Sequence, residues 1–159
     1  MTTTALEYAP WSTLEQEKGV SDDASTLRRV WDGIVTASES ITRGLALEDI
    51  RVGIRRAVLD AIDNQDISVE ESTVRYAEAF ATALPSSLQQ VDVSIDFDGD
   101  ISFDWDFGKR RVFAVSVRRD GVLNYAGLFG LNRLRGSEVL LRDIPSPILQ
   151  GILRAQRGR

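Results

Sequence analysis

The alternation of apolar and polar residues over 91–107 constrains the fold of this chain more than any other feature. Apolar side chains occupy the odd positions from Val91 to Phe107 except at Gly99, whereas only aspartate and serine occupy the even positions. A strict period of two, with aromatic and β-branched residues on one side, is typical of half-buried antiparallel strands. Similar residues follow up to Leu128, and the whole stretch predicts a four-stranded meander with one continuous apolar face.

The parity of the pattern also predicts the pairing of the strands. A slip of one residue would move every apolar side chain to the wrong face, so each loop must preserve parity, as a three-residue loop does. The predicted loops are Asp98–Asp100, Gly108–Arg110 and Arg119–Gly121. The predicted pairs are Phe97 with Ile101, Ile95 with Phe103, Val93 with Trp105, Trp105 with Phe113, Phe103 with Val115, Val117 with Leu123, and Val115 with Tyr125.

The polar face of the first hairpin is unusually acidic. Its candidate binding residues are Asp92, Asp96, Asp98, Asp100, Asp104 and Asp106. In the predicted register Asp92 faces Asp106, and two carboxylates about 5 Å apart repel by about 3 kcal/mol at an effective dielectric of 20. We therefore expect at least one of these aspartates to have a raised pKa. Three interpretations fit the face: protection of a sheet against association, a surface for a basic partner, and a metal-binding or catalytic carboxylate cluster.

Composition restricts the classes of function. The chain has 159 residues with no cysteine and no histidine, which removes disulfides, thiol catalysis, the commonest general base and the commonest metal ligand. We expect no cofactor and no resident metal. No apolar run reaches the length of a membrane span, and the first residues do not resemble a secretory signal. We expect a cytoplasmic protein, with residues 1–20 weakly structured and 21–159 forming a single α+β domain.

The charges are unevenly distributed along the chain. The net charge is −5, but residues 1–106 hold 8 Lys and Arg against 21 Asp and Glu, whereas residues 107–159 hold 11 against 3. The two parts therefore carry −13 and +8. Such asymmetry fits either halves that pair within one domain or two surfaces of opposite sign.

Helical patterns flank the predicted sheet. Apolar residues at spacings of three and four predict one helix from Asp22 to Gly44 and a second from Leu47 to Ile62. Ser68 and Glu71 have the spacing of a capping box and predict the start of a third helix, which Pro85 ends. After the meander we expect a basic loop over 131–136, a short fifth strand over 138–142, and a final helix that begins at Ser146. The predicted fold is therefore α+β, with N-terminal helices packed on a four- to five-stranded antiparallel meander and a C-terminal helix.

Three motifs resemble those of a group of small uncharacterised bacterial proteins. They are the strand Asp98-Gly-Asp-Ile-Ser-Phe-Asp-Trp105, the turn Asp120-Gly121, and the segment Tyr125-Ala-Gly-Leu-Phe-Gly130. In that group a helix that ends in Leu-Pro, here Leu84-Pro85, comes before the strand. The resemblance covers roughly residues 68–153. It implies a helix-plus-meander domain and carries no activity to this chain.

The leading functional hypothesis is a non-enzymatic interaction protein. Ordered carboxylates at strand spacing imitate a row of phosphates, and they would cover a basic, nucleic-acid-binding surface of another protein, as antitoxins, immunity proteins and phage-encoded inhibitors do. We expect no direct contact with nucleic acid or membrane. One alternative is a magnesium-dependent phosphodiesterase that uses Asp104 and Asp106 with Lys109. Another is self-association, for example a homodimer in which the acidic face meets Arg110, Arg111, Arg133 and Arg135 of a second copy.

Overall fold

The computed structural model describes residues 22–65 and 67–157. It divides into two units, residues 1–37 and 38–159. In the first unit the described residues form the beginning of a helix, and the second unit contains the rest of that helix and all the other elements. The expected weakly structured segment 1–20 lies outside the described residues.

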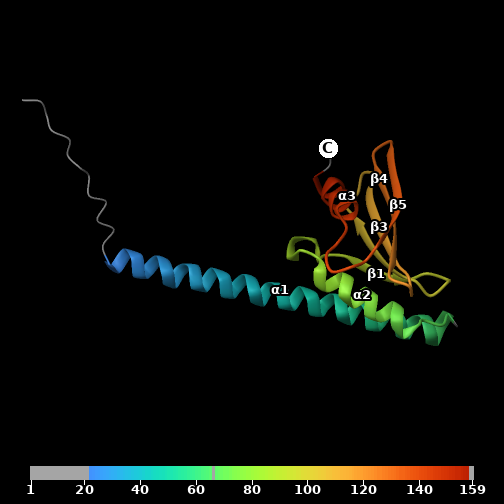
Figure 1. The fold of residues 1–159 in the computed structure, drawn as a ribbon, viewed down its shortest axis with the longest axis horizontal. Helices are drawn as coiled ribbons and strands as arrows, with labels where there is room; N and C mark the ends of the chain where they lie inside the picture. The colour runs from blue at the N-terminus through green and yellow to red at the C-terminus, as the bar shows by residue number, and fades with distance from the viewer. Residues whose placement is uncertain (1–21, 66, 158–159) are drawn as a thin grey trace, which may run out of the picture. The chain divides into compact units, whose positions relative to one another are not determined.

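The second unit has the predicted α+β architecture (Figure 1). The helices are α1 (Asp22–Gln65), α2 (Glu71–Ala83) and α3 (Ser146–Arg157), with a 3₁₀ turn η1 (Ser86–Leu88) after α2. The strands are β1 (Asp92–Ile95), β2 (Ile101–Asp106), β3 (Arg111–Val117), β4 (Val122–Phe129) and β5 (Asn132–Val139). The strands form one antiparallel sheet in the order β1-β2-β3-β4-β5, so every strand pairs with its neighbour in sequence.

The apolar face of the meander forms the core, as its parity predicts. Phe103, Trp105, Phe113 and Val115 are fully or almost fully buried. α2 contacts β2 and β3, α3 contacts β3 and β4, and the ring of Phe80 from α2 lies 5.0 Å from that of Phe103. The buried Trp105 donates a hydrogen bond of 2.9 Å from Nε1 to the carbonyl of Leu88, which ties η1 to the sheet. One face of the sheet is therefore covered by helices.

The predicted pairing is confirmed for the second and third hairpins. Trp105 pairs with Phe113 and Phe103 with Val115, whereas Val117 pairs with Leu123 and Val115 with Tyr125.

The predicted pairing is wrong for the first hairpin, in which Ile95 pairs with Ile101 and Val93 with Phe103. Gly99 has a positive φ of 82°, and its N–H donates to the carbonyl of Asp96. The loop therefore consists of residues 97–99, one position earlier than expected, because the last loop residue must adopt the left-handed conformation that glycine tolerates best. The parity is preserved, but every pair shifts by two residues.

The helical segments differ from the prediction at two points. α1 is one continuous helix, and Gly44 does not end it; a single glycine costs a helix interior only about 1 kcal/mol. α2 begins at Glu71 after the cap residue Glu70, which makes no side-chain capping bond, so Ser68 is not the cap. The prediction that α2 ends before Pro85 and that the last helix begins at Ser146 is confirmed.

The expected basic loop over 131–136 is wrong, because β5 occupies residues 132–139. Only Gly130 and Leu131 connect it to β4, and Gly130 has the positive φ of 66° that such a tight turn requires. β5 is an edge strand with several exposed polar residues, so it lacks the apolar alternation by which strands are recognised.

Candidate functional site: the acidic hairpin and the open face of the sheet

The sheet has an open face, the one opposite α2 and α3. Its side chains come from the alternate positions of each strand. From β1 to β5 the strand register aligns them in rows: Asp92, Asp104, Ala114, Ala126 and Arg135 form one row, and Ser94, Ser102, Ser116, Asn124 and Ser137 form the next. The open face thus changes from acidic at β1 and β2, through small residues, to basic at β5.

The acidic hairpin, residues 92–106, contains all six predicted binding residues. Asp92 faces Asp104 across β1 and β2, so the expected opposition of Asp92 and Asp106 is wrong. Asp96 and Asp100 close the loop through a backbone hydrogen bond of 2.9 Å, and Asp98 lies in the turn between them. Asp106 lies beside Val112 at the other end of β2. The hairpin therefore brings the six carboxylates onto one face and one tip.

Neutral donors orient three of these carboxylates. Asp96 Oδ2 accepts hydrogen bonds from the hydroxyls of Ser102 and Ser116, at 2.8 and 3.0 Å. Asp104 Oδ2 accepts one from Ser94 at 3.4 Å. Asp106 Oδ1 accepts one of 2.7 Å from the backbone N–H of Gly108 at the start of the next loop. These donors carry no charge, so they orient the carboxylates without forming ion pairs with them.

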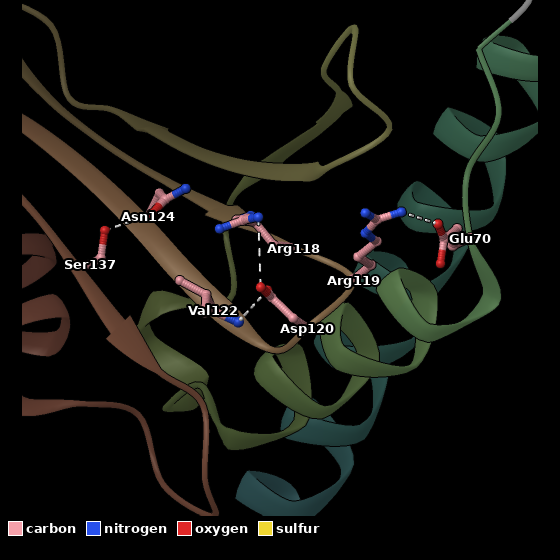
Figure 2. A network of polar contacts seen from close by, with 7 residues as sticks. All are labelled: Glu70, Arg118, Arg119, Asp120, Val122, Asn124 and Ser137. Atoms are coloured by element: carbon pink, nitrogen blue, oxygen red, sulfur yellow. Dashed lines mark hydrogen bonds and ion pairs between the residues drawn. The ribbon is translucent and has the colours of Figure 1, made fainter.

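The nearby arginines pair with other acids. Figure 2 shows Arg119 against Glu70 and Arg118 against Asp120, with nitrogen–oxygen distances of 2.7 and 3.6 Å. Among residues 22–65 and 67–157, none of the six hairpin aspartates has a lysine or arginine nitrogen within 4.0 Å. In the described part of the chain, the negative charge of the hairpin is therefore not cancelled by ion pairs.

Two of the hairpin carboxyls have raised pKa values, as predicted. Burial is the largest cause at Asp104: it raises the pKa above the ordinary value of 3.8, the hydrogen bond from Ser94 opposes the rise, and the charges of Asp96 and Asp92 add to it. Burial also leads at Asp100, where Asp98 raises the pKa further and Arg118 lowers it. Repulsion thus contributes as expected, but it is secondary to the loss of water around these groups.

The tip of the hairpin presents an aromatic side chain that the sequence pattern assigned to the apolar face. Phe97 is 97% exposed and lies between Asp96 and Asp98 in the turn. An exposed aromatic ring among charged residues is a frequent anchor in protein interfaces. The third predicted loop, in which Gly121 is the last residue, carries the signal that places Gly99 last and Phe97 first.

The basic end of the open face surrounds a shallow groove of about 830 Å³. Arg110, Arg133 and Arg135 border it, and Val112, Ala114 and Leu128 supply an apolar floor. Three strand spacings separate Asp104 from Arg135, about 14 Å at about 4.8 Å each. This exceeds the screening length of about 8 Å at physiological salt, so the basic end does not neutralise the acidic hairpin.

A second groove of about 730 Å³ follows the outer edge of β1 and is bordered by residues 46–60 of α1. Asp96 and Asp100 form a hydrogen-bonded pair, so by alternation the backbone N–H and C=O groups of Val93 and Ile95 point away from β2 toward this edge. The side chain of Gln89 also lines the groove. It is only 4% exposed, its Nε2 donates to the carbonyl of Leu84, and its Oε1 has no hydrogen-bond partner among the described residues.

Neither a carboxylate cluster for a metal ion nor a membrane-spanning helix is found in the described part of the chain. Over residues 22–65 and 67–157, no three aspartates or glutamates gather closely enough to hold a metal ion. Within the same residues, none of the helices combines the length and apolarity needed to cross a bilayer.

Comparison with known proteins adds no family to this description. No protein-family model, no curated protein and no solved structure matches the chain.

Proposed function

We propose that the protein is a non-enzymatic binding protein whose acidic hairpin covers a basic, nucleic-acid-binding surface of a partner protein, as antitoxins, immunity proteins and phage-encoded inhibitors do. A cytoplasmic location is part of this proposal. The observation that carries it is a hairpin with six carboxylates, none of which has a cationic partner among the described residues, and with the exposed ring of Phe97 at its tip.

The electrostatics support such a partner. Asp92 and Asp104 face each other across two strands, and the raised pKa of Asp104 means that its negative charge is held there at a cost in folding stability. A guanidinium or ammonium group placed beside the pair would offset both the repulsion and the loss of hydration. A row of carboxylates also attracts cationic surfaces over a distance and accelerates association, more strongly at low salt.

Phe97 supplies the apolar part of the proposed contact. Charged residues at the border of an interface mainly set the rate and the specificity of association, whereas buried aromatic residues near its centre contribute most of the affinity. Phe97 lies between Asp96 and Asp98 in the sequence, so one contact at the tip would bury the ring and pair neighbouring acids.

A pull-down from native lysate tests the proposal with one variant that removes carboxylate charges and one that removes the aromatic ring at the hairpin tip. The first variant is Asp98→Asn/Asp100→Asn, and the second is Phe97→Ser. The control is Glu39→Gln/Asp143→Asn, which makes the same change in net charge at exposed positions outside the hairpin. We expect the wild type and the control to retain one stoichiometric basic protein at low salt and to release it at high salt, and both hairpin variants to lose it.

Retention of the same protein by all four chains would contradict the proposal, because the contact would then lie elsewhere. Metal-dependent cleavage of phosphodiesters by the purified chain, abolished by Asp104→Ala, would instead support the nuclease alternative.

A further inference from the structure

The exposed apolar residues of α1 follow a heptad repeat. Positions at alternating spacings of four and three hold Leu27, Trp31, Ile34, Ser38, Ile41, Leu45, Glu48, Val52, Arg55, Leu59 and Ile62. Eight of the ten large apolar residues that α1 exposes fall on these positions, and the other two, Val30 and Val35, flank them. A repeat of 3.5 residues is the signature of a helix that packs along another helix.

In the second unit this stripe lies on the side of α1 that the core does not use. Ile41, Leu45, Val52, Leu59 and Ile62 are between 43% and 65% exposed. Ile50, Ile54 and Ala61 occupy the opposite side of the same helix and are almost completely buried. The second half of α1 is therefore apolar on two sides, and the described residues cover only one of them.

In the first unit the same heptad positions hold Leu27, Trp31 and Ile34, all of them exposed. A helix that exposes apolar side chains at a regular period gains stability mostly from packing against a partner, because propensity alone stabilises it little.

The charged residues within the stripe select the partner and its direction. Glu48 and Arg55 lie seven residues apart on the stripe, and Asp49 and Arg56 lie seven apart beside it. A parallel, in-register copy would place Glu48 beside Glu48 and Arg55 beside Arg55. An antiparallel copy with its two-fold axis near Val52 would instead bring Glu48 toward Arg55, and Asp49 toward Arg56, on both sides of the axis. The stripe is therefore complementary in charge to itself in the antiparallel direction.

We propose that α1 pairs with α1 of a second copy of this chain in an antiparallel coiled coil centred near Val52. From Ile41 to Ile62 the helix rises about 32 Å at 1.5 Å per residue, and five of the seven heptad positions along it hold large apolar residues. The acidic hairpin lies outside the stripe, so the pairing is independent of the proposed function and leaves two hairpins free in each dimer.

Sedimentation equilibrium of the full chain tests the proposal directly. We expect a dimer for the wild type and a monomer for Leu45→Glu/Leu59→Glu, because the substitutions place carboxylates in the apolar seam. The control is Leu131→Glu, which alters a leucine that is 85% exposed outside α1 and should leave the dimer intact. Circular dichroism of each variant reports whether the fold persists. A monomeric wild type, or a dimer that survives the double substitution, would overturn the proposal, as would a monomer that instead binds a different helical protein through α1.

Within one copy, Arg55 Nη2 lies 2.8 Å from Glu48 Oε1. Reversing the charge at one of these two positions distinguishes this internal ion pair from pairing between two copies. Glu48→Arg and Arg55→Glu each place like charges across the axis, so each variant alone should dimerise more weakly than the wild type. An equimolar mixture of the two should recover a heterodimer. No recovery in the mixture would mean that the charges act only within one chain.

The absence of native cysteine permits a clean test of direction. An antiparallel pair centred near Val52 brings residue 45 of one copy near residue 59 of the other, so an oxidised mixture of Leu45→Cys and Leu59→Cys should yield mainly the mixed disulfide. A parallel pair would yield disulfides within each single-variant preparation instead, and that result would refute the direction proposed.

Discussion

The serine–aspartate pattern of the first hairpin has two opposing effects at the level of single residues. The hydroxyls of Ser102 and Ser116 satisfy Asp96 without neutralising it. Burial of Asp104 in the same hairpin removes water from its carboxyl and raises its pKa. A charged group in such a position destabilises the fold at neutral pH, since the folded protein binds its proton more readily than the unfolded chain does.

Replacing Asp104 should therefore stabilise the protein at neutral pH. Asn keeps an acceptor for the Ser94 hydroxyl and removes the charge, so Asp104→Asn should raise the free energy of unfolding, by less than about 1 kcal/mol because water screens a half-exposed group. The wild type regains this stability as pH falls through the raised pKa of Asp104 toward the ordinary value of 3.8. Urea unfolding of both proteins at neutral pH and at a pH below 3.8 measures this difference in stability. If the stability difference between Asp104→Asn and the wild type instead increased at lower pH, the raised pKa of Asp104 would be contradicted.

Residue-level reading of the sequence predicted the acidic face correctly and the first loop incorrectly. Parity alone determines which side chains share a face, and the aspartates lie where parity places them. It cannot distinguish registers that differ by two residues, because both preserve the face. The left-handed backbone at Gly99 decides between them, and that requirement also moves Phe97 from the expected apolar face to the tip.

At the level of elements, the hairpin tip is held against the connection between α1 and α2. A Cβ on Gly99 would collide with the backbone carbonyl oxygen of Ser68, whereas a Cβ on Gly108 in the next loop would meet no atom of the described residues within 4 Å. Both glycines have a positive φ, so they form a matched pair in which only the contact differs.

Gly99→Ala should destabilise the protein more than Gly108→Ala. The left-handed conformation costs either alanine about 1–2 kcal/mol, and the collision at Gly99 should add at least about 1 kcal/mol because backbone must move. Thermal or urea unfolding of the two variants measures the difference. Equal losses would show that the tip does not rest on residue 68.

A second pair of glycines tests the packing of α3 on the sheet. A Cβ on Gly151 would enter the ring of Phe113, which is buried and stacks with Tyr125 and Phe129. Gly151→Ala should therefore destabilise the fold by about 1–3 kcal/mol through overpacking, although alanine favours helices. Gly44→Ala in α1 meets open space and should stabilise the helix by up to about 1 kcal/mol. A gain in stability from both substitutions would mean that α3 is packed more loosely than the structure has it.

The elements that the sequence predicted well are those with one clear apolar period. β2, β3 and β4 alternate, and α2 and α3 have distinct breakers or caps at one end. The fifth strand was expected over 138–142 but occupies 132–139, because an edge strand needs no apolar alternation. α1 was divided because Gly44 resembles a helix end. The buried acceptor of Gln89 and the groove beside β1 leave no local signal, since they depend on how distant segments pack.

At the level of the whole molecule, the uneven charge along the chain gives the open face of the sheet an acidic end and a basic end. The acidic first part supplies β1 and β2, and the basic second part supplies Arg110, Arg133 and Arg135 at the other end of the open face. Because the two ends are farther apart than the screening length, each is available to partners of opposite sign.

The stability of the whole protein should depend on its concentration if α1 pairs with a second copy. Dimerisation stabilises the folded state by mass action, so the melting temperature of the wild type should rise with protein concentration. The melting temperature of Leu45→Glu/Leu59→Glu should not. Calorimetry across a hundredfold range of concentration measures both, and a constant melting temperature for the wild type would speak against the coiled coil.

The most direct test of the acidic hairpin as a docking surface measures how partner binding depends on salt and on the two tip residues Asp98 and Asp100. We predict that the wild type retains a basic protein at low salt, releases it at about 1 M salt, where the screening length is about 3 Å, and loses it on replacement of Asp98 and Asp100 by Asn but not of Glu39 and Asp143. A partner that stays bound to the Asp98→Asn/Asp100→Asn variant at low salt would contradict the account.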